Sequence, residues 1–213
     1  MADAHAPNEC VNARTRECAR QLSYILRDLP DAQHEAWALA AEFGTVAATL
    51  AATPRRVAAV VRDGAAVTPA LASFAETLSD VLESRVDDRP LVSDSQALRD
   101  LLHAQMAFLP REEVRALFLD ARNRLIRCEI AARGTIDASA IHIRELIHRA
   151  LDLGSTALIL AHNHPSGDPT PSAHDVALTR AVVAAAEPLR ITVHDHVIVA
   201  RGGQVSLRAS GLI

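Results

Sequence analysis

The chain has no lysine, so all 22 of its lysine-plus-arginine positions are arginines. Without a lysine, neither Schiff-base catalysis nor the phosphate-binding lysine of a P-loop is available. Cysteine is scarce as well: Cys10, Cys18 and Cys128 are too few and too scattered for a disulfide framework or a cysteine-ligated zinc site. Three such thiols fit a protein of the reducing cytosol.

Long apolar segments and aromatic side chains are also lacking. No run approaches the roughly 18 residues of a membrane span, and the N-terminus lacks the apolar core of a signal peptide. Aromatic residues make up 3% of a chain that is 49% hydrophobic, so Ala, Val, Leu and Ile must fill its core. A formal net charge of −4 gives no general attraction to nucleic acid. We therefore expect a soluble cytoplasmic protein that does not bind membranes.

The first part of the chain carries a helical pattern rich in Ala and Leu. Residues 1–10 are expected to form a loose tail and residues 11–88 a small all-helical domain. Phe43-Gly44 predicts the end of one helix. Thr53-Pro54 and Thr68-Pro69 each predict a helix start, because Thr is a good N-cap and Pro suits the first helical position.

The second part, residues 93–213, mixes strand and helix patterns. The polar segment Asp87–Pro90 separates it from the first part, since proline disfavours helix just before it. Arg111–Glu113 is predicted to be a short acidic turn. Strands are predicted at Val114–Leu119, Leu125–Ala132, Thr156–Ala161, Ile191–Val199 and Val205–Leu207, and helices at about 94–103, Ile143–Leu153 and Ala173–Ala186. This alternation predicts an α/β sheet.

The most informative segment, residues 162–175, reads His-Asn-His-Pro-Ser-Gly-Asp-Pro-Thr-Pro-Ser-Ala-His-Asp. Because alternate strand residues point the same way, His162 and His164 can face one metal at the end of a predicted buried strand. Ser172 is a good N-cap for a helix that would return Asp175 to the same point. Two imidazoles and one carboxylate, with a fourth position left for water, are a ligand set of catalytic zinc. A His-x-His pair also occurs by chance, so spacing alone leaves a structural use open.

The motif His162-x-His164, seven residues and Ser172-x-x-Asp175 resembles the signature of the JAMM metallohydrolases. More narrowly, the segment Leu160–Ser172 resembles the RadC family, and the likeness covers about residues 95–213. Other segments that carry it are Phe118–Leu125, Gly134-Thr135, His142–Glu145 and Asp195–Val199. The resemblance implies a JAMM/MPN-like mixed β-sheet flanked by helices.

The same resemblance implies roles for individual residues. It assigns zinc binding to His162, His164 and Asp175. It assigns Ser172 to stabilising an oxyanion. A glutamate upstream acts as general base in this family, and the RadC pattern places it eight residues before the aspartate that ends the first predicted strand, which gives Glu112.

Alternatives to Glu112 stay open at this stage. Glu113 is the next candidate, because neighbouring acidic residues leave the register uncertain. Glu129 lies on the second strand of the predicted hairpin, and Glu145 fits a favourable charge at a helix N-terminus. The implied reaction is hydrolysis of a peptide or isopeptide bond, with the glutamate carrying a proton from the attacking water to the leaving amine. The substrate is expected to be a peptide or protein that the sequence does not identify.

The remaining histidines near the motif have mostly structural interpretations. His174 stands next to Asp175 and could compete as a ligand. His194 and His196 lie on one face of a predicted strand, with Asp195 on the other. The RadC likeness at Asp195-His196 indicates that one of these two histidines supports the pocket or a ligand.

The helical part resembles the helix-hairpin-helix region that RadC-like proteins often carry. The glycine hairpin that would hold a phosphate is replaced by Arg62–Thr68, which has one glycine and an adjacent aspartate and is a poor anion site. DNA contact there is only weakly supported. The main alternative to a zinc peptidase is a DNA repair or recombination accessory protein without hydrolysis. A metal-stabilised scaffold without turnover is a third possibility.

Overall fold

The computed structural model describes residues 13–87, 96–134 and 141–213. The chain divides into two compact units, residues 1–77 and 78–213, and the division falls within one helix. The predicted tail at residues 1–10 lies outside the described residues, as do residues 88–90 of the predicted boundary. Within the described parts of the chain, no helix combines the length and the apolar character needed to cross a bilayer.

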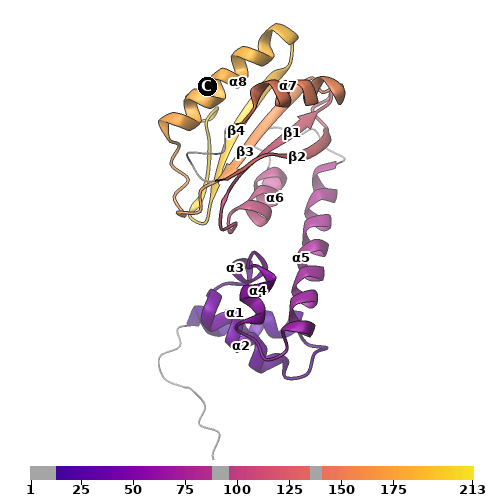
Figure 1. Cartoon of the computed structure of the whole chain (residues 1–213), viewed down its shortest axis with the longest axis vertical. Helices are drawn as coiled ribbons and strands as arrows, with labels where there is room; N and C mark the ends of the chain where they lie inside the picture. The colour runs from indigo at the N-terminus through magenta and orange to yellow at the C-terminus, as the bar shows by residue number, and fades with distance from the viewer. Residues whose placement is uncertain (1–12, 88–95, 135–140) are drawn as a thin grey trace, which may run out of the picture. The chain divides into compact units, whose positions relative to one another are not determined.

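The first unit consists of helices. They are α1 (Ala13–Ile25), α2 (Ala32–Phe43), α3 (Val46–Leu50), α4 (Pro54–Ala58) and the first part of α5 (Gly64–Asp87) (Figure 1). Gly44 ends α2 with a φ of 73°, which glycine tolerates without strain. Thr53 caps α4, because its hydroxyl accepts a hydrogen bond from the N–H of Arg56 at 3.4 Å, and Pro54 occupies the first turn. Both predicted helix boundaries are therefore confirmed.

The predicted start of α5 at Thr68-Pro69 is wrong. The helix begins at Gly64, where Asp63 accepts a hydrogen bond from the N–H of Ala66 at 3.0 Å and acts as the cap. Pro69 lies inside the helix, and the buried hydroxyl of Thr68 has no hydrogen-bond partner among the described residues. Because the helix starts earlier, Val67 belongs to it, and its side chain packs in the core of the first unit with 1% of its surface exposed.

The second unit is built on a five-stranded sheet in the order β2-β1-β3-β4-β5. Its strands are β1 (Glu112–Leu119), β2 (Leu125–Gly134), β3 (Ala157–Asn163), β4 (Thr192–Ala200) and β5 (Gly203–Ser206). β3 and β4 are parallel and every other neighbouring pair is antiparallel, so the sheet is mixed, as the resemblance implied. The predicted hairpin is confirmed as β1 and β2.

Helices cover both faces of the sheet (Figure 1). They are α6 (Gln96–Met106), α7 (Ile143–Asp152), α8 (Ala173–Ala186) and the short 3-10 turn Glu187–Leu189. One apolar core packs the side chains of α6 against alternate residues of β1, β3 and β4, such as Leu117 and Ile159. The other packs α7 and α8 against the intervening residues of the same strands, such as Phe118 and Leu160. Because β3 is buried on both faces, its sequence is a continuous apolar run up to the histidines.

Two details of the sheet differ from the expectation. Glu112 and Glu113 belong to β1 and not to a turn before it. β4 contains a bulge, since Leu158 pairs with Val193 whereas the next residue, Ile159, pairs with Asp195. Both details decide which side chains face the predicted site.

Candidate metal centre

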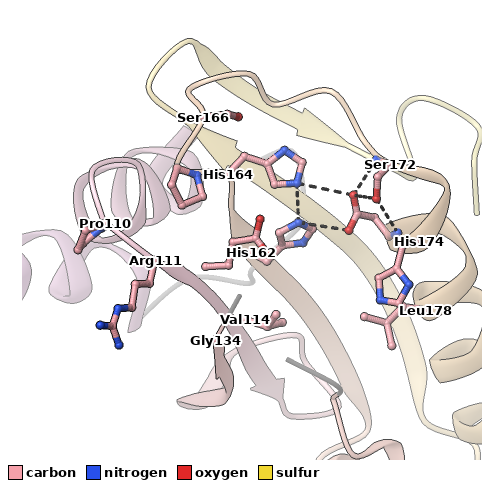
Figure 2. Close-up of a pocket in the computed structure, with 13 residues that line it drawn as sticks. Pro110, Arg111, Val114, Gly134, His162, His164, Ser166, Ser172, His174 and Leu178 are labelled. Atoms are coloured by element: carbon pink, nitrogen blue, oxygen red, sulfur yellow. Dashed lines mark hydrogen bonds and ion pairs between the residues drawn. The ribbon is translucent and has the colours of Figure 1, made fainter. Parts of the chain in front are cut away.

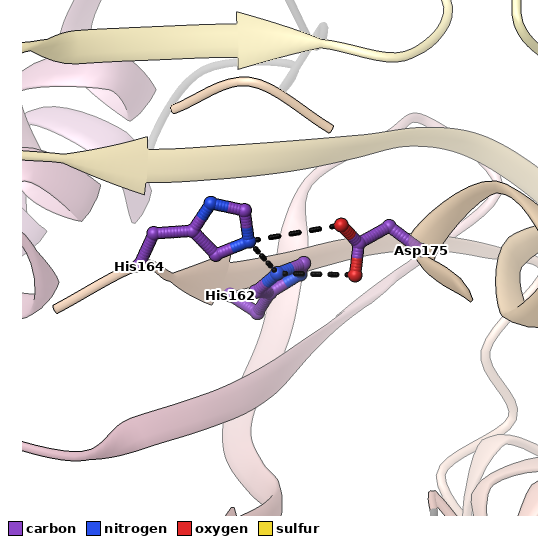
Figure 3. A group of neighbouring side chains, drawn as sticks. All are labelled: His162, His164 and Asp175. Carbon is purple, nitrogen blue, oxygen red and sulfur yellow. Dashed lines mark hydrogen bonds and ion pairs between the residues drawn. The ribbon is translucent and has the colours of Figure 1, made fainter. Parts of the chain in front are cut away.

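Three side chains from two elements converge at the end of β3. His162 lies on β3, His164 follows the strand directly, and Asp175 lies in the first turn of α8. The Nε2 atoms of the two histidines are 2.8 Å apart. Asp175 Oδ1 lies 3.4 Å from His162 Nε2, and Asp175 Oδ2 lies 3.6 Å from His164 Nε2 (Figure 3). The structure thus brings together the three residues that the sequence predicts to be ligands.

The spacing of these atoms fits a tetrahedral metal. Zinc bound by nitrogen and oxygen at about 2.0–2.2 Å has ligand atoms about 3.4 Å apart. Two of the three distances match this value, and the two imidazoles lie somewhat closer to each other. Among the described residues, these three form the group of His, Cys, Asp and Glu side chains that could hold a metal ion. The donor set of two nitrogens and one carboxylate suits zinc.

The loop after β3 is fastened so that His164 stays in place. The Nδ1 of His164 lies 2.9 Å from the carbonyl oxygen of Asp168, which can only accept a hydrogen bond. Nδ1 therefore carries the hydrogen, and Nε2 faces the site. Gly167 has a φ of 95°, a value that other residues rarely adopt. The N–H of Gly202 donates to the carbonyl of Gly167, and a Cβ at Gly202 would lie 2.7 Å from that oxygen. Arg201 donates to the carbonyls of Pro165 and Ser166. The β4–β5 turn therefore holds the ligand loop.

Asp175 is held by the start of its own helix. Ser172 and Asp175 form a capping box, in which Ser172 Oγ accepts from the N–H of Asp175 and Asp175 Oδ2 accepts from the N–H of Ser172 at 2.7 Å. The Ser172 hydroxyl also donates to Oδ2 at 2.7 Å. Burial raises the pKa of the carboxyl, but hydrogen bonds from His164 and Ser172 and the electrostatic interaction with His162 outweigh it and hold the pKa well below its usual range. Asp175 is thus presented to the site as a carboxylate.

The two imidazoles have different electrostatic surroundings. Burial lowers the pKa of His162 to about 4, so this side chain is neutral at pH 7. His164 is less buried, and the adjacent carboxylate of Asp175 raises its pKa. A neutral imidazole is the form that binds a metal, so burial favours the binding-competent form of His162.

The neighbouring glutamates Glu112 and Glu113 point to opposite sides of β1. Val114 pairs with His162 across the β1–β3 ladder, and Glu112, two residues before Val114, lines the same pocket. Glu113 faces the other side, where Oε1 accepts from Arg115 at 2.7 Å and Oε2 from Arg133 at 2.8 Å. Burial raises the pKa of Glu112, and the nearby charge of Asp175 adds to this effect, whereas His164 opposes it. Of the two glutamates, only Glu112 lines the pocket with the three candidate ligands.

Asn163, between the two histidines, fastens the strand end that carries Glu112. Its side chain is fully buried, and its Oδ1 accepts from the N–H of Glu113 at 2.8 Å. Its Nδ2 donates to the carbonyl of Arg111 at 3.1 Å. Both peptide groups that flank Glu112 are therefore tied to the segment that supplies the histidines. Strand alternation turns Asn163 away from the two histidines but gives no signal of this contact.

The candidate ligands open into a cavity of about 580 Å³. Ser172 and His174 face His162 and His164 across it (Figure 2). The lining residues are Pro110, Arg111, Glu112, Val114, Gly134, His162, His164, Pro165, Ser166, Ser172, His174, Asp175 and Leu178. His174 is part of this wall but does not belong to the group of candidate ligands.

The other predicted residues lie away from the cavity or behind it. Glu129 pairs with Arg149 of α7, with an N–O distance of 2.6 Å, and Glu145 is exposed on α7. His194 contacts the side chain of Asn123 in the β1–β2 turn at 2.7 Å. His196 is fully buried behind His162: its Nε2 lies 2.8 Å from His162 Nδ1. His196 is thus the histidine of this pair that supports a candidate ligand.

The expected arrangement of β4, with strict alternation of its side chains, fails at the bulge. Val193 packs in the α7–α8 core, and His196, three residues later, also faces α8, where its Nδ1 contacts Thr179 Oγ1. Strict alternation would place residues three apart on opposite faces. The extra residue in β4 removes this conflict, so the alternation behind the prediction that His194 and His196 share a face is interrupted between Val193 and Asp195. Asp195 Oδ1 accepts from the N–H groups of His196 and Arg208, and its Oδ2 accepts from Ser206, so the bulge is held from the β5 side.

We expect the metal-free protein to lose stability as the pH falls from about 6.5 to 4. Burial lowers the pKa of His162 to about 4 and that of His196 to about 3. In the unfolded chain both histidines would take up protons near their ordinary value of about 6.5, which the folded protein cannot do until a lower pH. The unfolded state is therefore favoured by about 1 kcal/mol per pH unit for each histidine.

One candidate ligand, His164, has the opposite effect on the pH dependence of stability. His164 has a raised pKa, so its contribution to stability is complete below the ordinary value and is lost as the pH rises through the raised value. Between pH 6.5 and 4, the two histidines with lowered pKa values outweigh the one histidine with a raised pKa. Urea unfolding of chelator-treated protein, followed by circular dichroism at pH 7, 6, 5 and 4.5, measures the effect. The fluorescence of Trp37, the chain's one tryptophan, follows the first unit and serves as the control. A free energy of unfolding that stays constant from pH 6.5 to 4.5 would contradict the expectation.

Comparison with known proteins supports the resemblance found in the motifs. The model of a family described as RadC-like JAB domain matches residues 92–212. A protein named UPF0758 protein, from Rhodobacter capsulatus, is 46% identical over 171 residues, which cover 80% of this chain and 80% of that protein. Residues 92–212 include the sheet, its flanking helices and the three candidate ligands. The chain therefore belongs to the RadC-like JAB domain family.

Proposed function

We propose that this protein is a zinc-dependent hydrolase of peptide or isopeptide bonds. The observation that carries the proposal is the position of Glu112 in the same cavity as His162, His164 and Asp175. A metal bound by three protein ligands keeps a fourth position for water or substrate. A carboxylate beside that position is the arrangement that metal-assisted hydrolysis requires.

When bound, zinc would supply Lewis acidity that makes a water molecule a nucleophile near neutral pH. Glu112 accepts a proton from the attacking water and passes it to the leaving amine. Its pKa, raised by burial, brings its proton affinity closer to that of the groups with which it exchanges protons. Asn163 holds the backbone on both sides of Glu112, which limits the drift of this carboxylate relative to the ligands.

Ser172 is proposed to donate its hydroxyl hydrogen to the developing oxyanion. In the structure this hydrogen is donated to Asp175 Oδ2. The N–H of Ser172 donates to the same oxygen, so the carboxylate keeps one partner when the hydroxyl turns to a substrate. Ser172 would then fulfil two roles at different stages: capping α8 and holding Asp175 before the reaction, and stabilising charge during it.

The alternative, DNA contact through the first unit, has a specific observation against it. In a phosphate-binding hairpin, free backbone N–H groups face the anion. Here the carboxylate of Glu35, which is 2% exposed, accepts hydrogen bonds from the N–H of Arg62 at 3.0 Å and of Asp63 at 3.2 Å. An internal anion thus occupies the position that a phosphate would take, and its charge would repel one.

Metal analysis combined with a cleavage assay tests the proposal. Purified protein should contain close to one equivalent of zinc, and a library of peptides and ubiquitin-like isopeptide conjugates should contain substrates that it cuts. A chelator should stop the cleavage, and added zinc should restore it. Bound zinc without any cleavage would support the metal-stabilised scaffold instead, and a protein with no metal affinity would refute the zinc site.

A further inference from the structure

A chain of hydrogen bonds runs behind the candidate metal centre from one ligand to another. It starts at the backbone carbonyl of Asp175, which lies 2.6 Å from Thr179 Oγ1. Thr179 Oγ1 lies 2.6 Å from His196 Nδ1, and His196 Nε2 lies 2.8 Å from His162 Nδ1. Thr179 and His196 are fully buried, so water cannot take the place of any of these partners.

The direction of every hydrogen bond in this chain follows from the first one, between Thr179 and the carbonyl of Asp175. A carbonyl oxygen can only accept, so the single hydroxyl hydrogen of Thr179 points to Asp175. The Thr179 oxygen must then accept from His196, which places the hydrogen of that imidazole on Nδ1. Among the described residues, the two ring nitrogens of this fully buried imidazole contact a hydroxyl and a second imidazole and no carboxylate, so it is neutral and carries one ring hydrogen.

The same logic decides the state of His162. Because Nδ1 of His196 carries its hydrogen, His196 Nε2 is an acceptor, and His162 Nδ1 must donate to it. The hydrogen of a neutral His162 is then on Nδ1, and its Nε2 presents a lone pair towards His164 and Asp175. The reversed chain would put a hydrogen on Nε2, where a metal must bind.

We propose that Thr179 and His196 are positioning residues that hold His162 in the one tautomer able to bind the metal. This inference rests on the proposed zinc site, which it deepens. The helix that supplies the ligand Asp175 also supplies, one turn later, the hydroxyl that orients His196. Residues that orient a ligand histidine through its other nitrogen typically change metal affinity 10- to 100-fold when they are mutated.

Zinc affinity of full-length variants tests the proposal. Thr179→Val keeps the shape of the side chain but removes the acceptor for His196, so both directions of the chain become available. Competition with a chelating dye should show zinc binding weakened 10- to 100-fold in this variant. Thr179→Ser keeps the hydroxyl and should retain the wild-type affinity. A Thr179→Val protein with wild-type affinity would overturn the proposal.

Thr49 offers a matched control in the first unit. It is fully buried and donates to the carbonyl four residues earlier, Thr45, at 2.9 Å, as Thr179 does to Asp175. Thr49→Val should leave zinc affinity unchanged, because it makes the same chemical change in a helix that carries none of the candidate ligands. If it weakens zinc binding as much as Thr179→Val, the effect comes from stability and the proposal fails.

Imidazole NMR gives a second test that needs no substitution. In metal-free protein with ¹⁵N-labelled histidine, two-bond proton–nitrogen couplings distinguish the tautomers. His162 and His196 should both carry their hydrogen on Nδ1. A hydrogen on Nε2 of either residue would overturn the proposal even if zinc binds. If the tautomers are as expected but the wild-type protein does not bind zinc, the zinc hydrolase proposal fails, and with it the role assigned to Thr179 and His196.

Discussion

Replacing Asp175 with asparagine should weaken zinc binding by about a thousandfold without unfolding the second unit. Structural zinc sites with four protein ligands are worth about 10–16 kcal/mol, which is about 3–4 kcal/mol per ligand, and we expect a loss of this size when one charged ligand is removed. Asparagine has the shape of aspartate, and its carbonyl oxygen can still accept the hydrogen bond from the N–H of Ser172. The substitution therefore separates the charge at the site from the cap of α8. Calorimetric titration with zinc and thermal unfolding of the metal-free protein measure the two quantities.

Asp168 provides the matched control for this substitution. It lies on the loop between β3 and α8 and is exposed, and its Oδ1 accepts from the N–H of Thr170 at 2.9 Å. Asp168→Asn makes the same change in charge and should bind zinc as the wild type does. Equal zinc affinity for the wild type and Asp175→Asn would show that Asp175 is not a ligand.

The second large effect is expected from Glu112→Gln. Glutamine has the size of glutamate but cannot take up a proton, so kcat for a substrate found in the peptide library should fall by about 10²- to 10⁴-fold. Zinc content should stay the same, because Glu112 does not belong to the group of candidate ligands. Metal analysis alongside steady-state kinetics separates the loss of the base from the loss of the metal.

The neighbouring glutamate gives the contrasting result. Glu113→Gln should leave kcat within a few-fold of the wild type, because Glu113 faces Arg115 and Arg133 and not the cavity. It should instead lower the free energy of unfolding by about 1–3 kcal/mol, since it weakens two charged hydrogen bonds. If Glu113→Gln loses activity and Glu112→Gln keeps it, then Glu113 and not Glu112 is the general base.

The three candidate ligands were predictable because their convergence depends on local geometry. In His-x-His at a strand end, strand alternation sets the directions of the two imidazoles. In Ser-x-x-Asp at a helix start, the capping box sets the position of the carboxylate. The predicted bounds of α8, Ala173–Ala186, match the structure. The ambiguity between Glu112 and Glu113 arose because the start of β1 was interpreted as a turn. Extending the strand by two residues places Glu112 on the side of Val114 and Glu113 on the other, because strand side chains alternate.

Other features depend on distant parts of the chain and have no local signal. The bulge in β4 is held by contacts of Asp195 with Ser206 and Arg208, which follow it by more than ten residues. The start of α5 depends on which of two candidate caps buries Val67 and Leu71 in the first unit. Pattern reasoning chose Thr68-Pro69, a strong local signal that the packing of the core overrides.

The bulge at His194 also limits which changes in length this chain can tolerate. A deletion of one residue there would restore an uninterrupted ladder between β3 and β4. It would also turn either Val193 or His196 to the opposite face of the sheet. One outcome leaves a gap in the apolar core, and the other removes the imidazole behind His162. A more regular sheet is thus incompatible with the present site, so this strand can change by substitution but not by losing a residue.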